Sequence, residues 1–248
     1  MEILTQFLLR LSFGLAFGMG ITSPQKVSSG FFRNHLYVTL GLATLAAVVL
    51  FQVSNSAAWL AVTAAVASFF GAAFWLYESK AAGRFALWLV VAVSLAGALL
   101  ALPTHTQAEL PSALRMIAVA TSGLLLGVTT TAMLLGHWYL NAPGMDLEPL
   151  RKLIHVAMAN TAVQALVCGS GLAAELSSRD FSLAWLLFIA LRWTFGLLGV
   201  FGLLWMARQT LKIPNTQSAT GILYVAVIGV FVGELTSVLL SAESTFPL

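Results

Sequence analysis

Eight long apolar runs, separated by short polar loops, constrain the fold of this chain more than any other feature. No loop exceeds about 15 residues, and runs of about 20 apolar residues match the ~30 Å hydrocarbon core of a bilayer. The sequence therefore predicts an all-α, polytopic transmembrane helical bundle of about eight spans, a single integral membrane domain over residues 1–248 with no soluble domain. The expected spans are residues 3–21, 36–53, 57–77, 85–102, 113–138, 150–174, 182–207 and 218–240.

The composition excludes several other classes of protein. Only 8% of the residues are charged and 59% are hydrophobic, whereas a soluble domain carries roughly 25% charged residues. Strands of a membrane barrel alternate apolar and polar side chains, but these runs are apolar on all sides. The net charge of +3 is small and its basic residues lie in loops, so we expect no nucleic-acid partner. The single cysteine, Cys168, excludes an internal disulfide.

The distribution of Lys and Arg predicts the orientation in the membrane. The even-numbered loops hold only Arg115 and Arg179, whereas cytoplasmic loops carry an excess of basic residues. We therefore expect the odd-numbered loops to be cytoplasmic and both termini to lie outside, in a multi-pass protein of the plasma (inner) membrane. The basic residues of the odd-numbered loops are Lys26, Arg33, Lys80, Arg84, Arg151, Lys152, Arg208 and Lys212.

Three charged residues, Arg10, Arg192 and Glu234, lie well inside predicted spans, with Arg192 near the middle of its span. A charge at the bilayer centre costs several kcal/mol and normally faces a partner or a cavity. We expect Glu234 to lie within ion-pair reach of one of the two arginines. The set forms either a helix clamp with a snorkelling Arg10, or a polar pocket for an acidic or carbonyl-bearing ligand. In the first span, Gly14 and Gly18 predict close packing of another helix.

A second candidate site surrounds the turn within residues 127–164, which has His137 before it and His155 after it. His35, at the start of the second span, is expected at the same cytoplasmic end. Neutral imidazole binds metals and haem iron, so we expect haem b or a quinone head group here if the rings point into the bundle; no metal is identified. Asn160 and Gln164 share a face of the sixth span and either join this site or bond between helices.

These features favour one function and leave two alternatives. The leading hypothesis is a largely structural, non-catalytic membrane subunit of a respiratory or photosynthetic electron-transfer assembly, contacting quinone, haem or pigment beside other membrane subunits. The alternative is a secondary transporter or channel for a small solute that uses Arg10, Arg192 and Glu234. The third is a lipid-binding or assembly protein that carries out no chemistry.

Overall fold

The computed structural model describes residues 2–102, 112–142, 144–176, 182–213 and 215–244, and within these ranges it contains helices and no strand. Eight helical segments there are long and apolar enough to cross a membrane, with α7, η2 and α8 forming one continuous span. The chain is therefore an all-α, polytopic membrane bundle. The elements are α1 (Glu2–Ile21), α2 (Ser29–Gln52), α3 (Ala58–Leu76), α4 (Lys80–Leu100), α5 (Ser112–Asn141), α6 (Glu148–Leu176), α7 (Leu183–Leu191), η2 (Arg192–Gly199), α8 (Val200–Thr210) and α9 (Thr216–Glu243).

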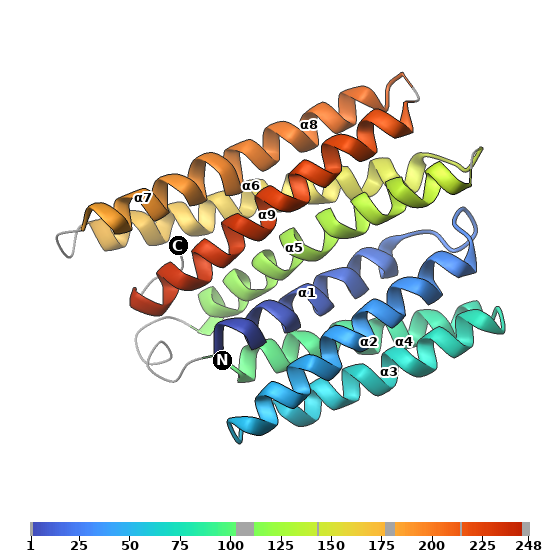
Figure 1. The fold of residues 1–248 in the computed structure, drawn as a ribbon, viewed down its shortest axis with the longest axis horizontal. Helices are drawn as coiled ribbons and strands as arrows, with labels where there is room; N and C mark the ends of the chain where they lie inside the picture. The colour runs from blue at the N-terminus through green and yellow to red at the C-terminus, as the bar shows by residue number, and fades with distance from the viewer. Residues whose placement is uncertain (1, 103–111, 143, 177–181, 214, 245–248) are drawn as a thin grey trace.

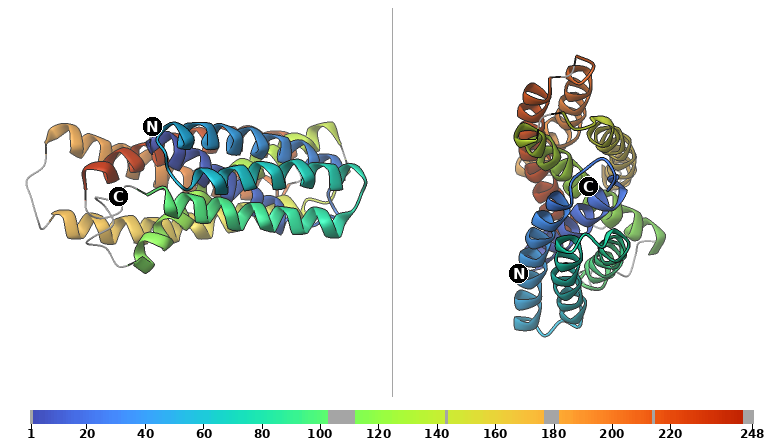
Figure 2. Two further views of the ribbon diagram at one scale, coloured as in Figure 1. Left: turned by 90° about the horizontal axis from the view of Figure 1, so that it is seen from below. Right: turned by 90° about the vertical axis from the view of Figure 1, so that its right-hand side faces the viewer.

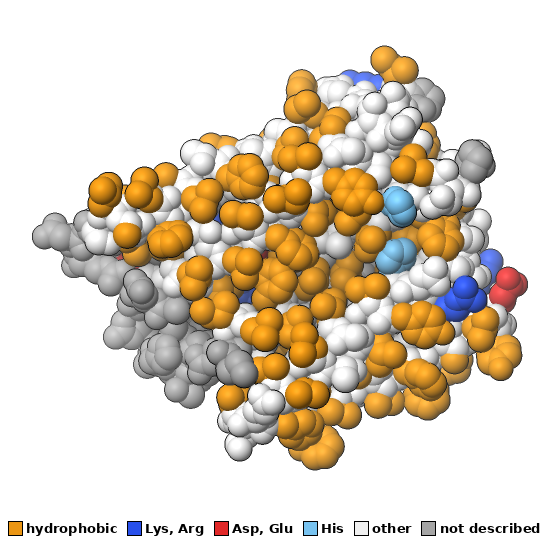
Figure 3. All heavy atoms as spheres, in the orientation of Figure 1, with side chains coloured by type: hydrophobic (Ala, Val, Ile, Leu, Met, Phe, Trp, Pro, Cys, Tyr) orange, Lys and Arg blue, Asp and Glu red, His pale blue; other side chains and the backbone are white. Residues whose placement is uncertain are grey.

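The spans run side by side along the long axis of the molecule, and successive spans alternate in direction (Figure 1). The ends of α1 and α9 near the two chain termini lie at the same end of the bundle, because an even number of spans separates them. The turns that follow α1, α3, α5 and α8 lie at the opposite end. Figure 3 shows hydrophobic side chains spread over the broad face of the bundle, as contact with lipid requires.

The spans form two groups of four, α1–α4 and α5–α9. In each group the first span packs against the second and the fourth, and the third span completes the ring. The end-on view in Figure 2 shows the blue-to-teal helices of the first group below the yellow-to-red helices of the second. The two groups meet chiefly where α1 packs along α5. Residues on these two helices therefore occupy the centre of the molecule.

Glycines on α1 and α5 allow this close approach. A Cβ atom placed on Gly14 would lie 1.9 Å from the carbonyl oxygen of Gly123, and one placed on Gly127 would lie 1.9 Å from the carbonyl carbon of Gly14. A Cβ atom placed on Gly18 would likewise lie 2.5 Å from Oγ1 of Thr131. The close packing predicted for the first span is confirmed, and its partner is α5. Small residues permit such approach in lipid, where van der Waals contact drives helix association.

Several helices extend beyond the predicted apolar spans. The second span was expected to begin at residue 36, but α2 begins at Ser29 and takes Phe31 and Phe32 into the helix. Both side chains are buried, and the ring of Phe32 stacks on Trp75 of α3 with centroids 4.2 Å apart. The helix continues because it can bury these rings against neighbouring helices. Hydropathy reports only the part of a helix that matches the hydrocarbon core.

Basic side chains at the end opposite the termini tie helices together. Lys26 forms an ion pair with Asp146 at 2.7 Å and a second contact with Glu148, which joins the two four-span groups. Lys152 donates to the carbonyl oxygen of Ile21 at 3.0 Å, and Arg151 to that of Leu211 at 2.8 Å. Both acceptors lie at the C-terminal ends of helices, where cations are favoured by the helix dipole.

Candidate functional site

The three candidate histidines share one end of the bundle but not one surface. His35, on α2, is buried, and its Nδ1 lies 2.6 Å from the carbonyl oxygen of Phe31 one turn earlier. Since a carbonyl only accepts, Nδ1 carries the proton. The ring of His35 also packs on Phe31 and lies 6.4 Å from the ring of Trp138. This environment holds His35 within the contact between α2 and α5.

His137 and His155 are both exposed on the surface of the bundle. Nδ1 of His137 lies 3.1 Å from the hydroxyl of Tyr224 on α9. A shared ligand was expected only if both rings point into the bundle, and the exposure of the two residues does not meet this condition. Among the described residues, no group of three or more His, Cys, Asp or Glu side chains is placed to hold a metal ion. Binding of haem b or quinone at these histidines stays a prediction.

The amides of α6 do not join the histidines. Asn160 is buried and donates from Nδ2 to the carbonyl oxygen of Thr121 at 2.8 Å, which links α6 to α5. Gln164, one turn further on, donates from Nε2 to Sγ of Cys168 at 3.6 Å. Its Oε1 is buried and has no hydrogen-bond partner among the described residues. Asn160 therefore has the structural role of an interhelical bond, whereas Gln164 contacts a different set of residues.

Through Cys168, Gln164 contacts a buried charge cluster. We define this cluster as Arg10, Ser122, Cys168, Arg192 and Glu234. Nη1 of Arg192 lies 2.8 Å from Oε1 of Glu234, and both side chains are 0% exposed. The ion pair expected from the sequence is thus present, and its arginine is Arg192. The hydroxyl of Ser122 donates to Oε2 of Glu234, so both carboxylate oxygens have partners.

Arg10 reaches the buried charge cluster from the side of α1. Its Nη1 lies 3.2 Å from Oγ of Ser122, so the serine hydroxyl stands between this second guanidinium and Glu234. Its Nε donates to Oε1 of Gln6 at 3.1 Å, and Gln6 donates in turn to the carbonyl oxygen of Ala98 at 2.9 Å. Arg10 is half-buried. It is therefore held by the bundle and does not simply extend to the head groups.

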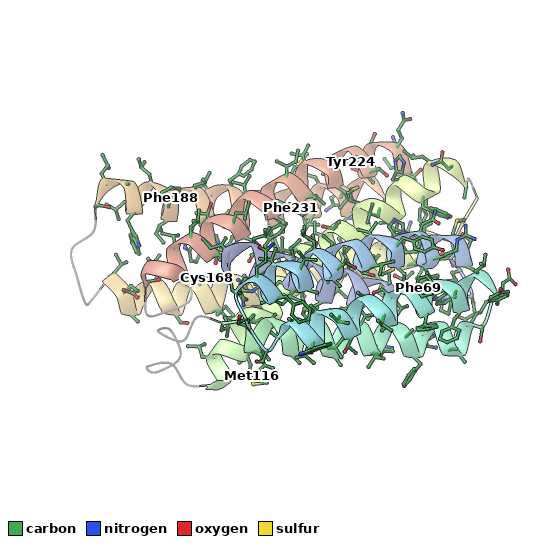
Figure 4. All side chains as sticks on the ribbon, turned by 60° about the horizontal axis from the view of Figure 1, so that its bottom comes forward. Phe69, Met116, Cys168, Phe188, Tyr224 and Phe231 are labelled. Atoms are coloured by element: carbon green, nitrogen blue, oxygen red, sulfur yellow. The ribbon has the colours of Figure 1, made fainter. Side chains whose placement is uncertain are left out.

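The cluster lies at one level in the membrane. Its members are eight to ten residues from the helix ends on the side of the termini, or about 12–15 Å at 1.5 Å per residue. Arg192 was expected near the middle of its span, but the span covers Leu183–Thr210 and places it in the half toward the termini. Figure 4 shows Cys168 in that half and Tyr224, the partner of His137, toward the other end. The charge cluster and the histidines are therefore separate sites.

Positive charges outnumber negative charges in the cluster. Two guanidiniums, on Arg10 and Arg192, face the single carboxylate of Glu234, which leaves one formal positive charge among these residues. Among the described residues, Nη2 of Arg192 contacts only Sγ of Cys168, at 3.7 Å, and a thiol is a weak acceptor. Nε of Arg192 is buried without a hydrogen-bond partner among the described residues. Buried charge without full compensation is costly, so the cluster is suited to receive an additional acceptor.

The backbone is irregular where it presents Arg192. Residues Arg192–Gly199 form a π-helix, η2, within the otherwise α-helical seventh span. A Cβ atom placed on Gly196 would lie 2.6 Å from Cα of Gly233, so this glycine pair lets η2 and α9 touch. The contact sets Glu234, the next residue, against Arg192. π-Helical turns occur frequently at functional sites.

A pocket of about 330 Å³ lies between α7 and α9. It is lined by Ser182, Ala184, Trp185, Phe188, Leu239 and Leu240. Phe188 precedes Arg192 by four residues, so the two share a side of the helix and are about 6 Å apart along its axis. The pocket thus lies between the charge cluster and the end of the bundle that carries the termini.

The sequence predicted Arg10, Arg192 and Glu234 as one set, placed Gln164 with the histidines instead, and indicated no role for Ser122 or Cys168. A buried cysteine usually acts as a small apolar residue, serine is common where membrane helices pack, and nothing in the spacing of these two residues distinguishes them. Gln6 was detectable, because it precedes Arg10 by four residues and four-residue spacing places side chains on one face. No protein-family model matches the chain, and neither a curated protein nor a solved structure shows significant similarity to it.

Proposed function

We propose that the protein is a secondary transporter for a small anionic solute, which binds at the buried charge cluster. The observation that carries the proposal is the presence of two arginines and one carboxylate, from α1, η2 and α9, at one level of the bundle. A monovalent anion balances the charge of this set. Intramembrane ionisable residues commonly mark the path of a substrate or ion.

The arrangement of Ser122 suggests how the anion is accommodated. Its hydroxyl connects Glu234 to Arg10, while Glu234 directly contacts Arg192. When an anion binds Arg192, the carboxylate of Glu234 shifts toward Arg10, and each guanidinium then has one negative partner. One carboxylate oxygen, Oε1, already contacts Arg192, and the other, Oε2, already contacts Ser122 beside Arg10. Glu234 thus neutralises one guanidinium, and the substrate neutralises the other.

The irregular backbone at Arg192 supports the same proposal. Transporters commonly bind substrates where a membrane helix is discontinuous, because irregular backbone is tolerated where it lines a cavity. Here η2 changes the hydrogen-bond pattern of the seventh span at Arg192 without breaking the helix, and the contact of Gly196 with Gly233 brings the two backbones together without intervening side chains. Movement between η2 and α9 at this contact opens the cluster.

We further propose the orientation that the basic residues favour. The end of the bundle bearing Lys26, Arg151 and Lys152 is cytoplasmic, and both termini lie outside the plasma (inner) membrane. The charge cluster then lies nearer the outer face, and the solute reaches it first from that side.

Uptake by reconstituted protein tests the function. Proteoliposomes are loaded with buffer and exposed to labelled acetate, with and without a pH gradient. We expect saturable uptake that Arg10→Gln reduces at least tenfold, because the variant removes one of the two guanidiniums. The control is Arg84→Gln, on an exposed arginine near the start of α4. Uptake that is absent in the native protein, or equal in the two variants, refutes the proposal.

A second candidate function is contact with quinone in an electron-transfer assembly of several membrane subunits. The observation that favours it is the hydrogen bond between His137 and Tyr224, both exposed at a surface that faces lipid. If Tyr224 donates to Nδ1, the Nε2 proton of His137 is available to a quinone carbonyl. Saturable binding of decylubiquinone that His137→Phe abolishes, or a haem band in a reduced-minus-oxidised spectrum, supports this function. Absence of both excludes it.

A further inference from the structure

The pocket between α7 and α9 has an apolar, partly aromatic wall. Trp185 and Leu240 are buried and pack together, while Phe188 is 45% exposed at the rim. The Ser182 hydroxyl accepts a hydrogen bond from the backbone N–H of Trp185 at 3.2 Å and so caps α7. The volume of about 330 Å³ is at the small end for ligand pockets. A pocket of this size and lining is suited to one ring or a short branched chain.

The pocket and Arg192 share one side of the seventh span. Trp185 precedes Arg192 by seven residues and Phe188 by four, and residues at these spacings share a face of a helix. At 1.5 Å per residue they lie about 10 Å and 6 Å from Arg192 along the axis. A ring between Trp185 and Phe188 therefore lies on the side of the helix that carries Arg192, about one to two turns from that residue along the axis.

Arg192 has donors to offer such a ligand. Its Nε is buried and without a hydrogen-bond partner among the described residues, and its Nη2 has only the thiol of Cys168. Nε and an Nη group form the planar fork that binds the two oxygens of a carboxylate. A carboxylate also supplies the negative charge that the cluster lacks. Charge and shape thus indicate one end of the ligand, and the pocket indicates the other.

We propose that the substrates of this site are aromatic monocarboxylates with a short linker, of the size of phenylacetate, whose ring occupies the α7–α9 pocket while the carboxylate binds Arg192. This inference rests on the transport function proposed above and names its substrate class. Phe188 moves aside to join the pocket to the cluster. Acetate binds the same arginine without filling the pocket, and it is therefore the weaker ligand.

Filling the pocket tests the inference. Ala184 lines the pocket and is exposed, so Ala184→Trp places a ring there without disturbing the core. The control is Leu187→Trp, at a residue that is 62% exposed on the same helix but does not line the pocket. Titration calorimetry measures the binding of phenylacetate, acetate and phenethylammonium to each protein in detergent.

We expect the native protein and Leu187→Trp to bind phenylacetate at least tenfold more tightly than acetate, and not to bind phenethylammonium. Ala184→Trp should lower the affinity for phenylacetate to that for acetate and leave acetate binding unchanged. Equal affinities for phenylacetate and acetate in the native protein, or equal losses for both in Ala184→Trp, overturn the inference but not the transport function. Binding of neither acid contradicts both.

A measurement on a variant with a milder change gives an independent test. 4-Bromophenylacetate quenches the fluorescence of a tryptophan that it contacts, and Trp185 lines the pocket. Saturable quenching should be present in the native protein and be lost in Trp185→Phe. Quenching of the same amplitude in both proteins places the ring elsewhere and refutes the proposed pocket.

Discussion

Replacing Glu234 by glutamine measures how much the bundle depends on the charge balance of the cluster. Glu234 and Arg192 are fully buried with a 2.8 Å contact. Glutamine keeps the shape and one acceptor oxygen but removes the negative charge, so Arg192 loses its direct counter-charge. Loss of one partner of a buried ion pair costs about 3–5 kcal/mol. Since each kcal/mol shifts Tm by about 2–4 °C in chains of 150–250 residues, we expect Tm to fall by about 6–20 °C.

The single cysteine provides the assay. Cys168 is buried and free, so a fluorogenic maleimide reacts with it only as the protein unfolds in detergent. The control is Glu78→Gln, at an exposed carboxylate beside α4, which should change Tm by less than about 2 °C because isolated surface charges contribute little.

A double variant separates the ion pair from other effects of the substitution. Arg192→Met combined with Glu234→Gln removes both charges, and buried pairs replaced together are often close to neutral. We expect the double variant to be more stable than Glu234→Gln alone, with a coupling energy of about 1–3 kcal/mol. The reasoning is refuted if Glu234→Gln lowers Tm no more than Glu78→Gln does. It is also refuted if the destabilisation of the double variant equals the sum of those of Arg192→Met and Glu234→Gln measured separately.

Three further outcomes follow from packing and polar contacts. Gly127→Ala forces α1 and α5 apart and should destabilise the protein by about 1–3 kcal/mol, whereas Gly41→Ala, with nothing within 4 Å of its Cβ position, should not lower Tm. Tyr139→Phe removes the 2.7 Å bond from the Tyr139 hydroxyl to the carbonyl oxygen of Asp146 and should cost about 0.5–1.5 kcal/mol in the same assay. Lys26→Met should cost less than about 1 kcal/mol, with an effect that disappears in high salt, because its ion pairs are exposed.

The sequence by itself determined the number of spans and the need for charge compensation. Span length follows from the thickness of the bilayer, and an apolar run either reaches across the hydrocarbon core or does not. Likewise, an isolated charge is costly in lipid, so Glu234 requires a partner whatever the arrangement of the helices. The glycines of the first span predicted close contact because only small residues permit it.

Only the tertiary structure decided which faces of the helices meet. A membrane helix is apolar all round, so hydropathy does not define its rotation about its own axis. That rotation exposes His137 and His155, although both lie on the spans where they were expected. It also places Ser122 between Arg10 and Glu234, and selects Arg192 as the direct partner. The contacts between α1 and α5 and between η2 and α9 set these rotations, and they join residues more than a hundred and about forty positions apart.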